Sequence, residues 1–346
     1  MSSPKISINN RVIGPNHFPL VVAEIGINHE GNIDKAFQMI DDARKTGCEC
    51  VKFQSHIIED EMIPNDVVPA NSKDTIWNIM KRCAFTEEQE AQLKEYAEKK
   101  NMIYLCTPFS RKAANRLQKL NVSAFKIGSG ECNNYPLVEH IAQFKKPVIL
   151  STGMNNLENI EKSVNILRRY KVQFALLHCT SIYPTPYEKV RLGALSQLKN
   201  TFPDAVVGLS DHSLTNYPCL GAVALGASIL ERHFTSDKNW PGPDISISMD
   251  PPELKDLIEG SRAIFKALGG KKEILAEEQP TIDFAYASVV SIKDIIAEEI
   301  LSEDNIWVKR PGTGEIKAAQ YKSLLGKRAK IDIGADSQIK WDWICE

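Results

Sequence analysis

Polar residues with chemically useful side chains occur in pairs, separated by one residue, within apolar stretches of the sequence. The pairs are Lys52 with Gln54, Ser210 with His212, and Glu231 with His233. Alternate residues of a β-strand point to the same side, so each pair is expected to face one compartment. A buried lysine or glutamate destabilises a fold unless it has a partner, so these positions predict ligands or counter-charges.

Lysine and serine side chains in these stretches predict an anion site. Lys52 and Lys126, together with Ser129, Ser151 and Ser210, could surround a dianionic group such as a phosphate, or a carboxylate. The alternative is that the two lysines form internal ion pairs with Glu24 or Glu231. The expected position of these residues at strand ends favours the anion site.

Two histidines, His212 and His233, end neighbouring expected strands and predict a site for a divalent metal ion. Neutral imidazole is the commonest protein nitrogen ligand for such ions. With two protein ligands, water or substrate oxygens would complete the coordination shell, which suits Lewis-acid catalysis better than structural zinc. The alternative is a pair of hydrogen-bonded histidines, and the surrounding lysines and serines favour the metal.

Eight short β-branched or aromatic runs carry these residues and alternate with amphipathic, helix-like segments. The runs are residues 20–27, 48–55, 102–108, 124–129, 147–152, 174–180, 205–211 and 228–234. Such alternation over roughly 250 residues predicts a (β/α)₈ barrel (TIM barrel), whose active site lies at the carboxyl ends of the strands. A doubly wound open sheet is the alternative.

The rest of the chain predicts a second, smaller domain. Residues 1–270 are expected to form the barrel, with a hairpin around Asn9 and Asn10 closing its bottom, and the long connection at 56–85 suits a functional lid. A charged linker is expected at 271–283. Residues 284–346, with short runs broken by turn residues, predict a compact module.

The composition of the chain excludes several classes of function. The net charge of -2 provides no field for nucleic-acid or membrane-surface binding, so the function is expected to lie in a pocket. The start of the chain lacks a signal-peptide pattern and no apolar run is long enough to cross a bilayer, which predicts a cytoplasmic protein. The cysteines have the pattern of buried, reduced thiols.

Six ordered motifs are similar to those of bacterial N-acetylneuraminate (sialic acid) synthases. They are EIGINHEG (24–31), IGSGECNNYPL (127–137), HCTSIYPTPYE (178–188), GLSDHS (208–213), ERHFT (231–235) and WVKRPG (307–312). The resemblance spans nearly the whole chain and includes a C-terminal antifreeze-like (SAF, β-clip) domain. It implies condensation of phosphoenolpyruvate with N-acetylmannosamine and water, giving N-acetylneuraminate and phosphate, with a manganese-type divalent ion, or magnesium or cobalt in its place.

The resemblance also implies residue roles. His212 and His233 match metal ligands, and Glu24 and Glu131 match the acidic residues near the reacting carbons. Matches to phosphoenolpyruvate contacts are Lys52, Lys126, Ser129, Ser151, Ser181 and Ser210, and matches to the sugar site are Gln54, Tyr183, Asp244 and Arg310. Ser181 stands where the family has asparagine, so that contact is expected to be shortened or replaced by water.

The resemblance further implies a homodimer with swapped lids. In such a dimer Arg310 would reach the active site of the partner subunit. Two alternatives remain for the function. Related synthases make legionaminic or pseudaminic acids from 2,4-diacetamido hexoses, but the GSGECNNYPL and IYPTPYE segments favour N-acetylmannosamine. A non-catalytic sugar-binding barrel is the other, and the presence of both histidines, both lysines and both glutamates argues against it.

Overall fold

The computed structural model describes residues 3–345. Within them, eight parallel strands run in the hydrogen-bonded order β5-β4-β3-β10-β9-β8-β7-β6. The strands are β3 (Leu20–Gly26), β4 (Cys50–Ser55), β5 (Ile103–Pro108), β6 (Phe125–Ile127), β7 (Val148–Ser151), β8 (Phe174–Cys179), β9 (Val206–Asp211) and β10 (Ile229–His233). Because β5 and β6 also pack side by side, the sheet is a nearly closed barrel. The predicted (β/α)₈ fold is confirmed, and the open sheet is excluded.

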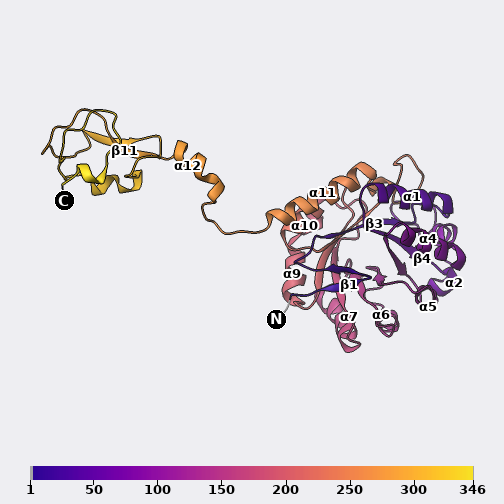
Figure 1. The fold of residues 1–346 in the computed structure, drawn as a ribbon. Coiled ribbons are helices and arrows are strands. Elements are labelled where there is room, and N and C mark those ends of the chain that lie inside the picture. Colours follow the sequence, from indigo (N-terminus) through magenta and orange to yellow (C-terminus); the bar gives the residue numbers. More distant parts are fainter. Residues whose placement is uncertain (1–2, 346) are drawn as a thin grey trace. The chain divides into compact units, whose positions relative to one another are not determined.

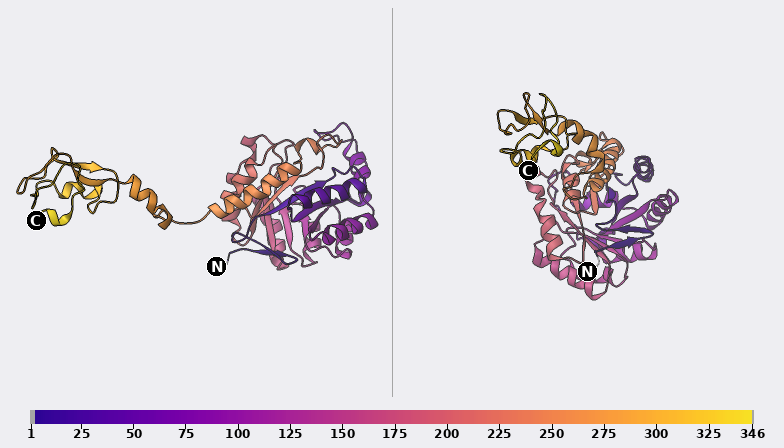
Figure 2. Two further views of the ribbon diagram at one scale, coloured as in Figure 1. Left: turned by 45° about the horizontal axis from the view of Figure 1, so that its top comes forward. Right: turned by 60° about the vertical axis from the view of Figure 1, so that its left-hand side comes forward.

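Helices surround the strands in Figure 1 and in both further views of Figure 2. They are α1 (Ile33–Lys45), α2 (Ile58–Glu61), α3 (Ile76–Cys83), α4 (Glu87–Lys99), α5 (Arg111–Lys119), α6 (Tyr135–Ala142), α7 (Leu157–Arg169), α8 (Tyr187–Val190), α9 (Gly193–Thr201), α10 (Tyr217–Ala224) and α11 (Pro251–Ala267). A 3₁₀ turn, η1 (Ile245–Ile247), follows β10. No helix in the described part of the chain is long and apolar enough to cross a membrane.

Local sequence signals fix where the helices begin. The Asp250 side chain accepts from the Glu253 backbone N–H while the Glu253 carboxylate accepts from the Asp250 N–H, so a capping box starts α11, with Pro251 at its first position. In α1, the Asn32 side chain accepts from two backbone N–H groups. The residues of α1 that face the barrel are apolar and recur at helical spacing, at Ala36, Met39, Ile40 and Ala43.

The amino-terminal hairpin closes one end of the barrel. β1 (Ile6–Ile8) and β2 (Arg11–Ile13) pair antiparallel around Asn9, which has a φ of 52°. Ile6, Ile8 and Ile13 are buried in one cluster with the inward apolar residues of the strands, among them Leu20 and Val22. The hairpin was predicted, and its packing leaves the carboxyl ends of the strands as the open end.

The connection at 56–85, predicted as a lid, contains α2 and α3, and α4 follows it before β5. The Asn71 side-chain nitrogen within it donates to the Pro243 carbonyl (3.1 Å) and to Asp244 Oδ1 (3.2 Å). Arg82 forms an ion pair with Glu30 (2.8 Å). The connection is therefore tied to the segments that follow β3 and β10.

The chain divides into two compact units, one up to Gly269 and one from Gly270 onward. The second contains η2 (Ala276–Glu278), α12 (Gln279–Ala285), the antiparallel pair β11 (Ser288–Ser291) and β12 (Ile306–Lys309), η3 (Ala318–Ser323) and η4 (Trp341–Trp343). Buried residues such as Val289, Leu301 and Ile306 give this unit its own core. The segment predicted as a plain linker, 271–283, thus includes most of a short helix.

Candidate active site

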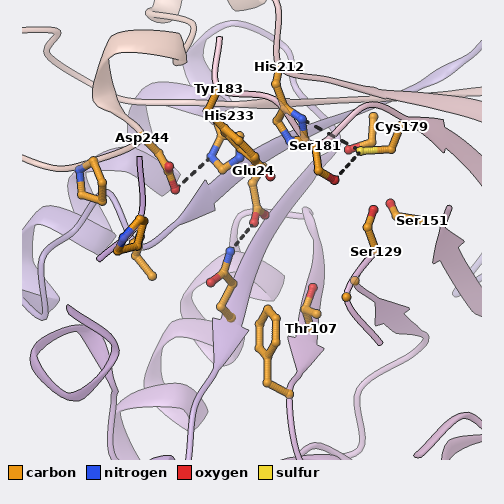
Figure 3. A pocket seen from close by; sticks show the side chains of 18 of the residues that line it. Glu24, Thr107, Ser129, Ser151, Cys179, Ser181, Tyr183, His212, His233 and Asp244 are labelled. Carbon is orange, nitrogen blue, oxygen red and sulfur yellow. Dashed lines mark hydrogen bonds and ion pairs between the residues drawn. The ribbon is translucent and has the colours of Figure 1, made fainter. Parts of the chain in front are cut away.

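A pocket of about 660 Å³ lies at the carboxyl ends of the barrel strands. Each of the eight strands contributes at least one of its lining residues. Figure 3 shows polar side chains from different strands pointing into this space. Of the residues predicted from the sequence, the structure brings together Glu24, Lys52, Gln54, Lys126, Ser129, Glu131, Ser151, Ser181, Tyr183, Ser210, His212, His233 and Asp244. Arg310 lies in the second unit, where its guanidinium is 5.7 Å from the Phe284 ring centre.

Four buried charged groups form an ion-pair cluster on the pocket wall. Lys52 Nζ lies 2.7 Å from Glu24 Oε2 and 3.6 Å from Glu231 Oε1, and Lys126 Nζ lies 3.4 Å from Glu231 Oε1. Burial would raise the pKa of Glu231, but the two ammonium groups outweigh it and lower that pKa. The internal ion pairs considered as an alternative are therefore present. They make the cluster neutral, so a bound anion needs further donors or cations.

Hydroxyl and backbone donors stand beside the cluster. Lys126 Nζ donates to Ser151 Oγ (2.8 Å), and the Gly153 N–H donates to Ser129 Oγ (3.0 Å). A Cβ atom at Gly153 would lie 2.5 Å from Ser181 Oγ and 2.8 Å from Ser129 Oγ. Glycine at this position therefore leaves room between the serines, in a space of the kind an oxyanion can fill.

The rings of the two histidines lie close together in the pocket lining, with ring centres 5.4 Å apart, and the Tyr183 ring lies 4.1 Å from that of His212 (Figure 3). His233 Nδ1 is buried without a hydrogen-bond partner and lies 3.8 Å from Asp244 Oδ2. Burial lowers the pKa of His233, which favours neutral imidazole. Burial would also lower the pKa of His212, but the negative charge of Cys179 in its ionised form and the hydrogen bonds to Cys179 and the Thr180 carbonyl raise that pKa to about 9.

This arrangement fits a metal held by two protein ligands. Within residues 3–345, no cluster of three or more His, Cys, Asp or Glu side chains could hold an ion. The buried, unpartnered nitrogen of His233 beside the ring of His212 is the donor set that remains. An ion there would displace the proton of His212 and take its other ligands from water or substrate.

Glu131, in the loop after β6, has a pKa near neutral pH. Its Oε2 is buried without a hydrogen-bond partner, and burial raises the pKa of the side chain to about 7. A Cβ at Gly128 would lie 2.6 Å from that oxygen, so the glycine allows the carboxyl group to approach the backbone. Glu131 can therefore hold or release a proton at physiological pH.

The raised pKa of Glu131 predicts a pH-dependent stability. Since the folded pKa of about 7 exceeds the usual value of 4.5, the folded state binds the Glu131 proton more tightly than the unfolded state does. The contribution of this proton to the free energy of unfolding is fully present below pH 4.5 and is lost as the pH rises through 7. The loss is up to about 3 kcal/mol, reduced by solvent screening because the side chain is partly exposed. Glu131→Gln, which mimics the protonated form, should flatten the melting temperature of the barrel between pH 5 and 8 and raise it at pH 8.

Calorimetry of both proteins across this pH range measures the effect. Glu139→Gln is the matched control, because Glu139 forms a surface ion pair with Arg169 (2.7 Å) and such pairs contribute little. If the Glu131→Gln barrel kept the same pH dependence as the parent, this assignment of the raised pKa would be wrong.

Three residues that line the pocket were given no role from the sequence. Glu231, which binds both lysines, was expected to face the pocket and was named as their alternative ion-pair partner, but it was given no catalytic or binding role. Thr107, whose Oγ1 accepts from Lys52 Nζ (3.3 Å), was given no role either. Cys179, interpreted as an apolar core residue, lies 3.9 Å from His212 Nδ1 and lines the pocket. The available signal was the strand-end position, which all three share with the residues that were predicted.

Other polar residues at strand ends serve the fold instead. The Asn28 amide donates to the Phe234 carbonyl and to Ser248 Oγ, both at 2.8 Å. His178 Nε2 is 2.6 Å from the Val190 carbonyl. Strand-end position alone therefore does not distinguish a residue that faces the pocket from one that ties two loops together.

Comparison with known proteins places both units in described families. Residues 39–273 match the NeuB family, and residues 286–344 match the SAF domain. The chain is 40% identical to an uncharacterized protein of Methanocaldococcus jannaschii, with 98% of each chain covered. It is 38% identical to N,N'-diacetyllegionaminic acid synthase of Campylobacter jejuni, over 93% of this chain and 98% of the relative.

A solved structure agrees. The N-acetylneuraminic acid (sialic acid) synthetase from Leptospira borgpetersenii, determined in complex with citrate, matches with a TM-score of 0.75 and 36% identity. The match covers 81% of this chain and 95% of that one.

Proposed function

The chain belongs to the NeuB family of sugar acid synthases and carries a SAF domain, and from this premise we propose that it condenses phosphoenolpyruvate with N-acetylmannosamine and water. The products would be N-acetylneuraminate and phosphate. The observation that carries the proposal is the convergence of two lysines, several serines and two histidines on one pocket. Relatives of this chain are enzymes that form sugar acids, which supports a catalytic barrel rather than a silent binding module.

The lysine and serine side of the pocket suits phosphoenolpyruvate. Lys52 and Lys126 would offset the charge of the phosphate and carboxylate groups, and Ser129, Ser151 and Ser210 would donate hydrogen bonds. Ser181, in place of the family asparagine, has a shorter side chain and would reach the ligand through water.

The charge balance of the pocket supports a bound cation. With Glu131 protonated, Glu24, Glu231 and Asp244 are balanced by the two lysines and the His212 imidazolium. The proposed substrate is itself an anion, so its charge would need a further cation to offset it. We propose that His212 and His233 hold a divalent ion, manganese in preference to magnesium or cobalt. Bound there, such an ion would supply Lewis-acid chemistry toward the aldehyde oxygen of the open-chain sugar.

Glu24 and Glu131 would manage the protons. After the alkene carbon of phosphoenolpyruvate bonds to the aldehyde carbon, positive charge develops on the carbon that bears the phosphate. The Glu24 carboxylate would stabilise this charge and take a proton from the attacking water, while protonated Glu131 supplies the proton for the new sugar hydroxyl. The resulting tetrahedral hemiketal phosphate would collapse with cleavage of its C–O bond, and the lysines would offset the charge of the departing phosphate.

The sugar would lie on the opposite side of the pocket, against Gln54, Tyr183 and Asp244. Asp244 is held by the Asn71 amide (3.2 Å), so its carboxylate has a fixed direction. We also propose a cytoplasmic homodimer in which Arg310 of each SAF domain reaches the N-acetyl group in the partner's site, as in a swapped lid. No nucleic-acid or membrane partner is expected.

A second amino sugar is a candidate because the Campylobacter jejuni relative, at 38% identity, is a diacetyllegionaminic acid synthase. The chemistry would be the same with a 2,4-diacetamido hexose as acceptor. Phosphate release from phosphoenolpyruvate, measured with each sugar and with or without manganese after chelation, tests reaction, acceptor and ion together. We expect manganese-stimulated release with N-acetylmannosamine. A strong preference for the diacetamido sugar would correct the acceptor, and no release with either would refute the function.

The room left by Gly153 predicts a specific binding defect. Gly153→Ala places a methyl group within 2.8 Å of two serine hydroxyls, which must rotate out of the anion site. The KM for phosphoenolpyruvate should rise about tenfold, as expected when donors lose their alignment. Gly193→Ala is the control, because a Cβ there meets nothing within 4 Å. Steady-state kinetics decide, and an unchanged KM would remove Gly153 from the anion site.

A further inference from the structure

A continuous chain of side-chain contacts runs from outside the pocket to Glu24. Glu61 Oε2, on α2, lies 2.8 Å from His56 Nδ1, and His56 Nε2 lies 3.0 Å from Gln54 Oε1. The Gln54 side-chain nitrogen then donates to Glu24 Oε1 (3.0 Å), and the other Glu24 oxygen contacts Lys52. His56 does not line the pocket, but it contacts a residue that does.

Hydrogen-bond polarity fixes the direction of this chain. Glu24 is the ion-pair partner of Lys52, and an ionised carboxylate only accepts, so the Gln54 nitrogen must face it. The Gln54 oxygen therefore faces His56, and Nε2 of His56 must carry the hydrogen. The Nδ1 and Glu61 pair shares one further proton, whichever atom holds it. A reversed Gln54 amide would place two acceptors, its carbonyl oxygen and the carboxylate, against each other at Glu24.

Packing keeps His56 in place. Its side chain is 1% exposed, and its ring stacks on Phe109 with centres 4.6 Å apart and planes 13° apart. Residue Asp60 of α2 accepts from the Lys112 backbone N–H (2.8 Å), which anchors the helix that carries Glu61. The donor at Nε2 therefore has one direction available to it, toward Gln54.

We propose that His56 is a positioning residue that sets the orientation of the Gln54 amide and, through it, the direction of Glu24 and the shape of the amino-sugar site. This inference rests on the proposed function, in which Gln54 contacts the sugar and Glu24 acts on the reacting carbons. Phosphoenolpyruvate contacts come from other side chains, so the role of His56 concerns the acceptor sugar.

Two variants separate the donor from the ring. His56→Phe keeps an aromatic ring against Phe109 and removes the donor. We expect the KM for the amino sugar to rise about tenfold and kcat to fall about tenfold, with the KM for phosphoenolpyruvate within about twofold of the parent. His56→Gln offers an amide N–H near the position of Nε2 and should recover most of both losses. If His56→Phe lowers the stability of the protein because Glu61 is left without a partner, the double variant His56→Phe with Glu61→Gln tests the loss of the Nε2 donor without that charge.

A matched control exists on the outside of the barrel. His140 also contacts a phenylalanine ring, Phe144, at 5.1 Å and pairs with an amide oxygen, that of Asn115, at 2.7 Å. His140→Phe should leave all three kinetic constants unchanged. A merely structural role for His56 would lower thermal stability without changing the KM for the sugar. Unchanged kinetics in folded His56→Phe, or equal losses in the Phe and Gln variants, would overturn the proposal.

The ring nitrogens give a readout that does not depend on activity. In ¹⁵N spectra of histidine-labelled protein at pH 7, the resonances missing from His56→Phe belong to His56, one of seven histidines. We expect Nε2 to carry a hydrogen, and a bare Nε2 would overturn the proposed polarity. If the parent chain releases no phosphate with any sugar, the proposed function fails, while this measurement still decides the hydrogen-bond chain.

Discussion

Glu24→Gln is expected to lower kcat by at least about a hundredfold and to leave the barrel folded, as the loss of a general base does. The amide has nearly the same shape as the carboxylate but cannot accept a proton from water or stabilise positive charge. Lys52, which contacts Glu24 at 2.7 Å, keeps Glu231 at 3.6 Å as a partner, so the variant does not strand a buried ammonium group. Turnover by phosphate release and melting temperature are the two measurements.

The control for Glu24→Gln is Glu49→Gln, at the carboxylate that pairs with Arg11 of the amino-terminal hairpin (2.8 Å). That change should leave kcat within about twofold of the parent, because partly exposed pairs contribute little. Near-normal turnover in Glu24→Gln would remove Glu24 from catalysis and leave Glu131 as the remaining candidate base.

His212→Ala combined with His233→Ala is expected to reduce turnover by about a thousandfold or more. Loss of a Lewis acid removes several kcal/mol of transition-state stabilisation, and each 1.36 kcal/mol corresponds to a factor of ten. Exhaustive chelation of the parent should give the same loss, and manganese should restore the parent but not the variant. Manganese binding, measured by calorimetry without substrates, should disappear in the variant.

His17→Ala is the control for the histidine pair, because His17 is exposed in the segment after the hairpin, within the barrel unit but outside the pocket. It should keep full activity and manganese binding. Full turnover of the parent after chelation would end the metal hypothesis, even if the two alanines abolished activity by reshaping the pocket.

The barrel was predictable because its strands are buried on both faces and appear in the sequence as short apolar runs. The structure keeps all eight, trimmed by one to three residues, from Leu20–Gly26 to Ile229–His233. Against such runs, Lys52, Lys126 and His233 stand out as polar exceptions, and barrel topology brings their strand ends together. The composition of the pocket was therefore largely readable in advance.

The ion pairs inside the pocket were considered from the sequence only as the less favoured alternative to an anion site. The sequence cannot tell that Glu231 lies between two lysines, because the pairing depends on how three separate strands are staggered. Cys179 has the composition of a core residue, and only the coordinates bring its thiol near His212. The segment 271–283 has a linker's charge and proline content, yet residues from Gln279 onward form α12, a short helix without buried residues whose first turn holds Pro280, where proline is tolerated.

The hairpin that closes the amino-terminal end of the barrel limits the routes by which ligands can reach the pocket. Ile6, Ile8 and Ile13 fill the amino-terminal end of the barrel, so the pocket opens at the carboxyl end and does not continue through the barrel as a tunnel. Under the proposed function, ligands would enter and leave at the carboxyl ends of the strands, so a ligand bound against Lys52 and Lys126 would have to enter first. The second substrate would then cover the first, which predicts an ordered binding of the two substrates.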